Sequence, residues 1–241
     1  MISSMLESVG LVRLNELFGK HYVADRLEFN LNQGRVVLER LSGELLRLSV
    51  SSKNGVMEKL LYASESTPIY TKPIPPFGGP LDVGCLYLVL NEPIVVPSFA
   101  KIEMVQELPV DLGVFLGEVI VATLPLGRVK YALYGVPDMG DVCRYADSQI
   151  RSSYAVLAKA LLRITSTSKN TVEVGKLVVP IQSSTVVYTD KGSLFFSDVS
   201  VDIVTPHHIE VHTLGMSSII DGSPQLEFKG SGSTYIMKFG A

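Results

Sequence analysis

The stretch that decides the fold is RLEFNLNQGRVVLERLSGELLRLSVSSKNGVMEKLLY, residues 26–62. Its apolar residues recur with a period near two, the period of a β-strand, because successive side chains of a strand point to opposite faces. Turn residues interrupt the pattern at Asn32-Gln33-Gly34, Ser42-Gly43 and Asn54-Gly55, and they tolerate the positive φ of tight hairpins. The stretch therefore predicts four antiparallel strands, at residues 26–31, 35–41, 44–50 and 56–62.

The same rhythm continues toward the C-terminus, with further turn residues at Asp190-Lys191-Gly192 and Asp221-Gly222. It predicts strands at residues 84–90, 100–108, 113–124, 128–134, 141–147, 156–165, 171–180, 184–189, 193–205, 208–214 and 234–239. Only the first 18 residues show mixed helical spacing, after Ser3 and Ser4, which predicts a short N-terminal helix. We therefore expect an all-β protein.

Two breaks divide the strands into groups. Residues 67–80 hold five prolines and two glycines, so we expect a surface connector there rather than an interior strand. Residues 135–140, Gly-Val-Pro-Asp-Met-Gly, separate two strand series and predict a domain boundary. The expected organisation is an N-terminal extension (1–18) and two antiparallel β-sandwich-like modules (19–138 and 139–241), with one elongated sandwich or barrel as the alternative.

Composition and charge exclude several classes of protein. The chain has 21 Lys and Arg against 24 Asp and Glu, a net charge of -3, and so lacks the basic excess of nucleic-acid-binding proteins. Its longest apolar stretch, residues 112–127, contains Glu118 and is shorter than the ~20 residues of a spanning helix. Charged residues interrupt the N-terminal region, unlike the apolar run of a secretory signal. We expect a cytoplasmic location, no membrane insertion and no nucleic-acid partner.

The two cysteines, Cys85 and Cys143, lie far apart in the sequence and form no CxxC motif. Unpaired cysteine behaves as a small hydrophobic residue, so we expect two buried free thiols. A disulfide between them is the alternative.

Three motifs in the middle of the chain carry a resemblance to a known family. They are PVDLGVF (109–115), KYALYG (130–135) and GDVCRY (140–145). With them, the chain resembles domain-of-unknown-function family 432, found mainly in archaea, from about Phe18 to about Gly215. The resemblance implies an archaeal, cytoplasmic protein, and it supplies no activity, cofactor or substrate.

The family motifs suggest a ligand site. Strand alternation in residues 128–134 places Tyr131 and Leu133 toward the core and Lys130 and Tyr134 on the other face. If the loop at 135–140 folds the flanking strands together, Lys130, Tyr134 and Arg144 can converge on a carboxylate or phosphate. The alternative is structural, with Arg144 paired to one of the nearby aspartates, which are Asp111, Asp138 and Asp141.

A histidine-rich segment, residues 207–212, places His208, Glu210 and His212 on one face of a strand. At ~3.3 Å per residue the two histidines stand about 13 Å apart, too far to share an ion with ~2 Å bonds to nitrogen. We expect no metal and no cofactor. A site built from one adjacent pair and a third ligand is the alternative.

Catalytic residues stay unassigned, because the GxSxG, GxxxxGK[ST] and HExxH signatures are missing from the sequence. We expect a non-enzymatic binding or assembly protein. A mean hydropathy of +0.30, with apolar residues in excess of one buried face at 84–90 and 112–126, favours a homo-oligomer or a protein partner. The alternative is an enzyme or binding protein for a small anionic ligand at Lys130, Tyr134 and Arg144.

Overall fold

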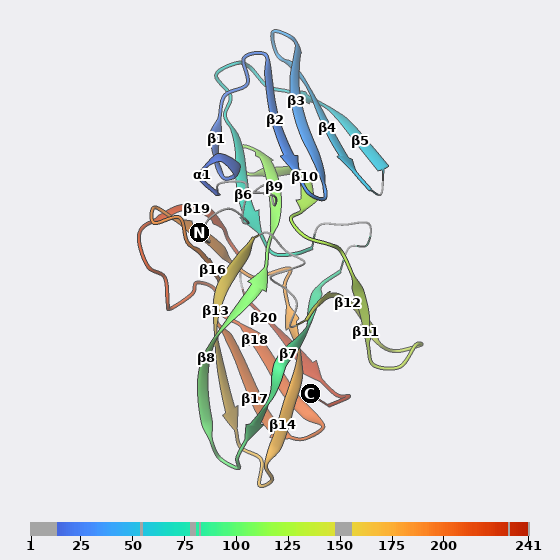
Figure 1. Ribbon diagram of the computed structural model, residues 1–241, viewed down its shortest axis with the longest axis vertical. Coiled ribbons are helices and arrows are strands. Elements are labelled where there is room, and N and C mark those ends of the chain that lie inside the picture. Colours follow the sequence, from blue (N-terminus) through green and yellow to red (C-terminus); the bar gives the residue numbers. More distant parts are fainter. Residues whose placement is uncertain are drawn as a thin grey trace, which may run out of the picture.

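The computed structural model describes residues 14–53, 55–77, 81, 83–147, 156–230 and 232–240. It confirms an all-β protein: among the described residues, twenty strands and one single-turn helix, α1 (Leu14–Leu17), make up the regular structure. A short helix was expected within residues 1–18. Residues 1–13 lie outside the described residues, and α1 lies within the remainder of this region. The molecule is elongated, with two sandwich-like modules stacked along its long axis (Figure 1).

The first sheet of the upper module is the meander predicted from residues 26–62. Its strands are β2 (Arg26–Leu31), β3 (Gly34–Ser42), β4 (Leu45–Ser52) and β5 (Gly55–Tyr62), paired antiparallel in chain order. Alternate residues such as Val36, Leu38 and Leu48 are buried, while their neighbours reach the surface. The period of two therefore sets which face packs on the core.

The second sheet of the upper module has the order β1 (Gly19–His21), β6 (Ile69–Ile74), β9 (Asp111–Leu116) and β10 (Val119–Pro125). β6 lies inside this sheet, so the expectation that residues 67–80 form no interior strand was wrong for 69–74. The reason is that β1 pairs with β6 only as far as Thr71. Pro73 pairs with β9 alone, where its missing N–H breaks no ladder to β1.

The lower module also has two sheets (Figure 1). One has the order β11 (Tyr131–Tyr134), β12 (Asp141–Ala146), β7 (Cys85–Val96) and β14 (Val172–Pro180). The other has the order β19 (Pro224–Phe228), β15 (Val186–Thr189), β16 (Leu194–Phe196), β13 (Leu157–Ser166), β17 (Val199–Thr205), β18 (His208–Thr213) and β20 (Ser233–Met237), and β8 (Lys101–Pro109) also pairs with β13. Most pairs are antiparallel, but β7–β12, β13–β16 and β13–β17 are parallel. Parallel neighbours need a long crossover, and between β7 and β12 the chain crosses through the upper module.

The chain passes between the modules more than once. β7 and β8, expected in the first module, pair with strands of the lower sheets, and β9 and β10 then return to the upper one. The expected boundary at residues 138/139 falls in the turn of the β11–β12 hairpin, whose register runs from Tyr131 opposite Arg144 to Tyr134 opposite Asp141. Buried apolar side chains of both modules belong to one continuous core.

A disulfide joins Cys85 of β7 to Cys143 of β12, with a Cα–Cα distance of 4.8 Å. The expected free thiols were therefore wrong, and the alternative was correct. The parallel register places Arg144 opposite Leu86, which brings the preceding cysteines side by side across 58 residues of sequence. In the part of the chain that the structure describes, no helix has the length and apolar character needed to cross a membrane.

Candidate functional site

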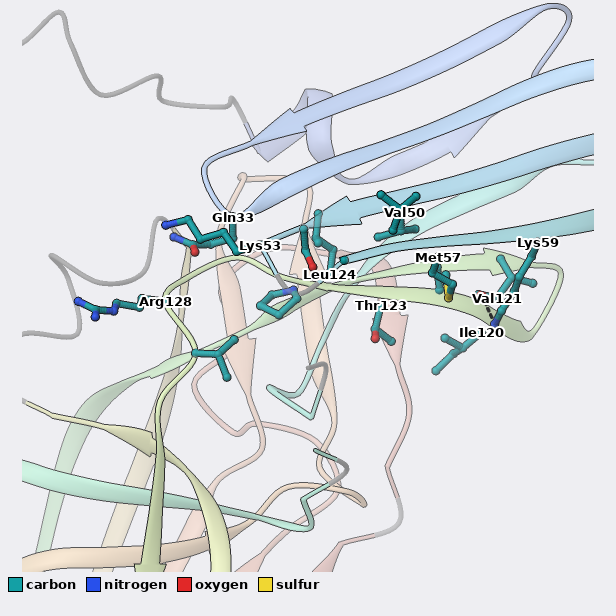
Figure 2. Close-up of a pocket in the computed structure, with 16 residues that line it drawn as sticks. Gln33, Val50, Lys53, Met57, Lys59, Ile120, Val121, Thr123, Leu124 and Arg128 are labelled. Carbon is teal, nitrogen blue, oxygen red and sulfur yellow. Dashed lines mark hydrogen bonds between the residues drawn. The ribbon is translucent and has the colours of Figure 1, made fainter. Parts of the chain in front are cut away.

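A groove of about 770 Å³ opens on the upper module between β5 and β10 (Figure 2). Each of these strands is the last of its sheet, so the groove is the open side of the sandwich. The described residues that line it are Gln33, Val50, Ser52, Lys53, Gly55, Val56, Met57, Lys59, Ile120, Val121, Ala122, Thr123, Leu124, Pro125, Arg128 and Val129.

The alternation of β5 places a lysine on the inner face of an edge strand. Met57, Lys59 and Leu61 lie opposite Val50, Leu48 and Leu46, all three of which are buried. The Lys59 Nζ reaches across the groove and donates a hydrogen bond of 2.9 Å to the Val121 carbonyl of β10 (Figure 2). The β9–β10 register shifts between Ile120 and Ala122, so this carbonyl lies at a β-bulge. Lysine and a bulge are both devices that protect sheet edges.

The groove is positively charged. Its described lining includes three cations, Lys53, Lys59 and Arg128, and no Asp or Glu. Lys53 and Arg128 are exposed, and neither forms an ion pair with a described residue. Figure 2 shows Gln33, Lys53 and Arg128 toward one end and Lys59 at the other, with Met57, Ile120 and Thr123 between them. The groove therefore combines an apolar floor with uncompensated positive charge at both ends.

The residues predicted as a ligand site lie elsewhere and in different surroundings. The β11–β12 hairpin forms, but its register puts Tyr131 opposite Arg144. The expected core face of residues 128–134 was wrong, because Leu133 is exposed whereas Tyr134 is buried. Arg144 therefore faces away from Lys130 and Tyr134. It is fully buried, with its Nη2 3.6 Å from Oδ1 of the equally buried Asp111. The alternative, pairing of Arg144 with Asp111, is the arrangement in the structure.

Lys130 and Tyr134 also have other partners. The Lys130 Nζ lies 3.8 Å from Asp147 Oδ2 and 5.7 Å above the Tyr145 ring. The buried Tyr134 hydroxyl donates to the Gly240 carbonyl and accepts from the Phe239 N–H, each at 3.0 Å. Burial raises the pKa of Tyr134. Anion binding by Lys130, Tyr134 and Arg144 together remains a prediction, and the structure does not bring the three side chains to one place.

The motif residues instead hold the junction of the two modules. Asp111 comes from the first motif and lies on β9 of the upper module, while Arg144 comes from the third motif and lies on β12 of the lower one. Gly135, at the end of the second motif, has φ +110°, and a Cβ there would lie 2.7 Å from the Phe239 ring. Ion pairing therefore explains Asp111 and Arg144 in the motifs, and backbone conformation and close packing explain Gly135.

The side chains of His208, Glu210 and His212 lie on the outer face of β18. The Glu210 carboxylate lies between the two rings, 3.1 Å from His208 Nε2 and 3.6 Å from His212 Nε2. His212 also lies 3.5 Å from Asp202 Oδ2 and 2.9 Å from the Thr234 hydroxyl. Within the described ranges, no group of three or more His, Cys, Asp or Glu side chains is arranged to hold a metal ion.

A second cavity, of about 620 Å³, lies beside the disulfide and is lined in part by Cys85, Asp141, Gln182 and Tyr235. The Tyr235 hydroxyl donates to the Asp141 carboxylate, and burial together with this bond raises the pKa of Tyr235. The Tyr235 hydroxyl and the Asp141 carboxylate are thus already paired with each other, whereas Lys53 and Arg128 of the first groove have no carboxylate partner among the described residues.

The sequence interpretation missed Lys53, Lys59 and Arg128 as site residues. The sequence does indicate the position of Lys59. It is two residues from both Met57 and Leu61, so on a strand its side chain lies on the same, inward face as theirs. The apolar segments used to predict self-association are largely inside the protein: Leu86, Leu88, Leu112 and Leu124 are all buried. Among the exposed large apolar side chains, Val56, Leu60 and Tyr62 lie on β5, and Leu133, Val136, Met139 and Val142 lie on the β11–β12 hairpin.

Comparison with known proteins gives one result. The family described as "Protein of unknown function (DUF432)" matches residues 17–233. Neither the curated proteins nor the solved structures that were searched contain a match. The match covers both modules and all three motifs, so this chain belongs to the DUF432 family.

Proposed function

We propose that this protein is a non-enzymatic binding protein that holds an anionic ligand in the β5–β10 groove. The observation that carries the proposal is the charge of the groove. Three cations and no carboxylate line its described part, although the chain has more acidic than basic residues. Such a separation of charge raises the local concentration of anions and favours their binding.

The groove also fits an apolar body next to the negative group. Val50, Met57, Ile120 and Leu124 supply apolar surface between the cationic ends, and Gln33 and Thr123 supply hydrogen-bonding groups. Ligand sites commonly combine mostly apolar walls with a few polar groups that fix orientation. A carboxylate or phosphate placed near Lys53, Lys59 or Arg128 would gain charge-assisted hydrogen bonds, each contributing ~1.5–3 kcal/mol.

Binding, rather than catalysis, is supported by the kinds of side chain present. The described lining has no His, Cys, Asp or Glu, the side chains that most often serve as general base or nucleophile. Ser52 and Thr123 carry hydroxyls but have no such base among the lining residues.

The test is calorimetric titration with decanoate, using decanol as the uncharged control. We expect decanoate to bind with one-to-one stoichiometry and decanol to bind at least tenfold more weakly. Arg128→Gln and Lys53→Gln should each weaken decanoate about tenfold, since each removes one charge-assisted contact. Lys169→Gln makes the same charge change on an exposed residue of the β13–β14 loop and should have no effect. Equal binding of decanoate and decanol, or no binding of decanoate, would overturn the proposal.

We also propose that the protein works in the cytoplasm of an archaeal cell. The disulfide restricts this proposal, because intracellular disulfides are stable mainly in hyperthermophilic archaea and bacteria. Thiol titration of protein from its own cells, alkylated at lysis, should find Cys85 and Cys143 unreactive. Two reactive thiols per chain would show that the disulfide does not form in that compartment.

A further inference from the structure

We propose that the natural ligand is an extended peptide segment of another protein, which adds as a strand to the free edge of β5 and inserts acidic side chains into the groove. This inference rests on the proposed function, since it names the kind of anion that the groove takes.

The first step concerns the backbone of β5. The strand pairs with β4 along all eight of its residues, from Gly55 to Tyr62, and it is the last strand of its sheet. Figure 1 shows it on the outside of the upper module. No other strand in the described part of the chain pairs with its outer edge, whose N–H and C=O groups are therefore a template for another strand. β10, the other edge of the groove, is a poorer template, because its bulge interrupts the regular backbone and Lys59 occupies the Val121 carbonyl.

The second step concerns the outward side chains of β5. Val56, Leu60 and Tyr62 share the outer face of the sheet and are 68%, 65% and 76% exposed. β5 does carry two charged residues of the kind that protect natural edges, Glu58 between Val56 and Leu60 on the outer face and Lys59 on the inner face. Its length and its large exposed apolar side chains nevertheless mark an interaction site. An added strand would cover these three side chains with its own outward residues.

The third step concerns the inward side chains of the added strand. Side chains alternate between the two faces, so every second residue of the peptide would point into the groove beside Lys59 and Lys53. Acidic residues fit these inward positions, and apolar residues fit the outward positions beside Leu60 and Tyr62. The peptide is therefore expected to alternate apolar and acidic residues over about six to eight positions, the length of β5.

A second copy of this chain fits the edge less well. If two β5 strands paired antiparallel about a twofold axis, each would keep its own face. The inward positions of the copy would then be Met57, Lys59 and Leu61, which bring another cation and no carboxylate to the groove. Charge complementarity thus favours an acidic partner strand over self-association.

The experiment uses the full chain and an acetylated, amidated eight-residue peptide that alternates valine and glutamate. We expect one-to-one binding, competition with decanoate, and slower hydrogen exchange of the β5 amides in the complex. A valine–lysine peptide should bind at least tenfold more weakly. The valine–glutamate peptide N-methylated at every residue should also bind at least tenfold more weakly, because it has no N–H left to donate to β5 on either edge. Lys59→Gln should weaken the unmodified peptide about tenfold, and Lys169→Gln should not.

The outcomes separate the two proposals. If decanoate binds and the valine–glutamate peptide does not, the strand-addition inference fails and the proposed function stands. If neither binds, both fail. If the N-methylated peptide binds as tightly as the unmodified one, the peptide lies in the groove without pairing and the inference is overturned. If light scattering shows a dimer whose β5 amides are protected without peptide, a second copy covers the edge and the inference is likewise overturned.

Discussion

The buried Arg144–Asp111 pair gives the sharpest test of how the two modules are held together. Arg144→Met replaces the guanidinium with an apolar side chain of similar length and leaves the Asp111 carboxylate fully buried. Removing one member of a buried ion pair typically destabilises a protein by ~3–5 kcal/mol, because the remaining charge loses its compensation. Typical domains have unfolding free energies of ~5–15 kcal/mol, so this loss ranges from about a fifth to nearly all of a typical value.

The double variant tests the mechanism of this loss. Asp111→Asn removes the negative charge but keeps an oxygen that can accept the Leu126 N–H, which lies 3.4 Å from Asp111 Oδ1. Combined with Arg144→Met, it leaves no uncompensated buried charge, so we expect the double variant to recover at least ~2 kcal/mol relative to Arg144→Met alone. Urea unfolding followed by far-ultraviolet circular dichroism measures all three proteins, and the chain has no tryptophan to provide a second signal.

Arg26→Met provides a matched control, because Arg26 pairs with Glu28 at the surface and loses little when the pair is removed. The reasoning would be refuted if Arg144→Met cost no more than Arg26→Met. It would also be refuted if the double variant were as unstable as the sum of the two single variants, since the two charges would then be independent.

Three further predictions follow from single features of the structure. Reducing the Cys85–Cys143 disulfide should lower the free energy of unfolding by about 4 kcal/mol, the loop-closure value for a separation of 58 residues, as measured by urea unfolding with and without a phosphine reductant. Gly135→Ala should destabilise the protein by ~1–3 kcal/mol, because of its φ of +110° and the nearby Phe239 ring, whereas Gly43→Ala, with no atom within 4 Å of the new Cβ, should be neutral in the same assay. Burial lowers the pKa of His21 below 6.5, so the folded state binds the imidazole proton less readily than the unfolded state, and the free energy of unfolding should fall as the pH drops below about 6.5. His21→Gln should flatten that part of the curve of unfolding free energy against pH. An unchanged curve would count against the burial effect.

The parts of the fold that depend on local pattern could be predicted from the sequence. In residues 26–62, the period of two and the turn residues were enough to give four antiparallel strands. The strands at residues 128–134 and 141–147 and the loop between them were also expected, and they form the β11–β12 hairpin. In each case the interacting strands are neighbours in sequence, so a short turn fixes their pairing.

The parts that depend on pairing between distant strands could not be predicted. The disulfide requires that β7 and β12 lie side by side, and the Asp111–Arg144 pair requires that β9 of one module meets β12 of the other. No local pattern carries these arrangements, because parallel strands are joined by long crossovers whose path is set by the whole core. The same limit applies to Arg144, because only the register of the β11–β12 hairpin shows that Arg144 faces away from Lys130 and Tyr134.

Lys59 shows how the candidate site depends on both kinds of information. Its parity is readable from the sequence, and an inward lysine on an interior strand would be buried at high cost, whereas the same lysine on an edge strand can reach solvent or a neighbouring carbonyl. The sequence therefore already contained a choice: either residues 55–62 form an edge, or Lys59 carries a buried charge. The structure resolves this choice in favour of an edge, with the Lys59 Nζ on the Val121 carbonyl. Because that edge also exposes Val56, Leu60 and Tyr62, the argument that explains the lysine also locates the surface most suited to a partner strand.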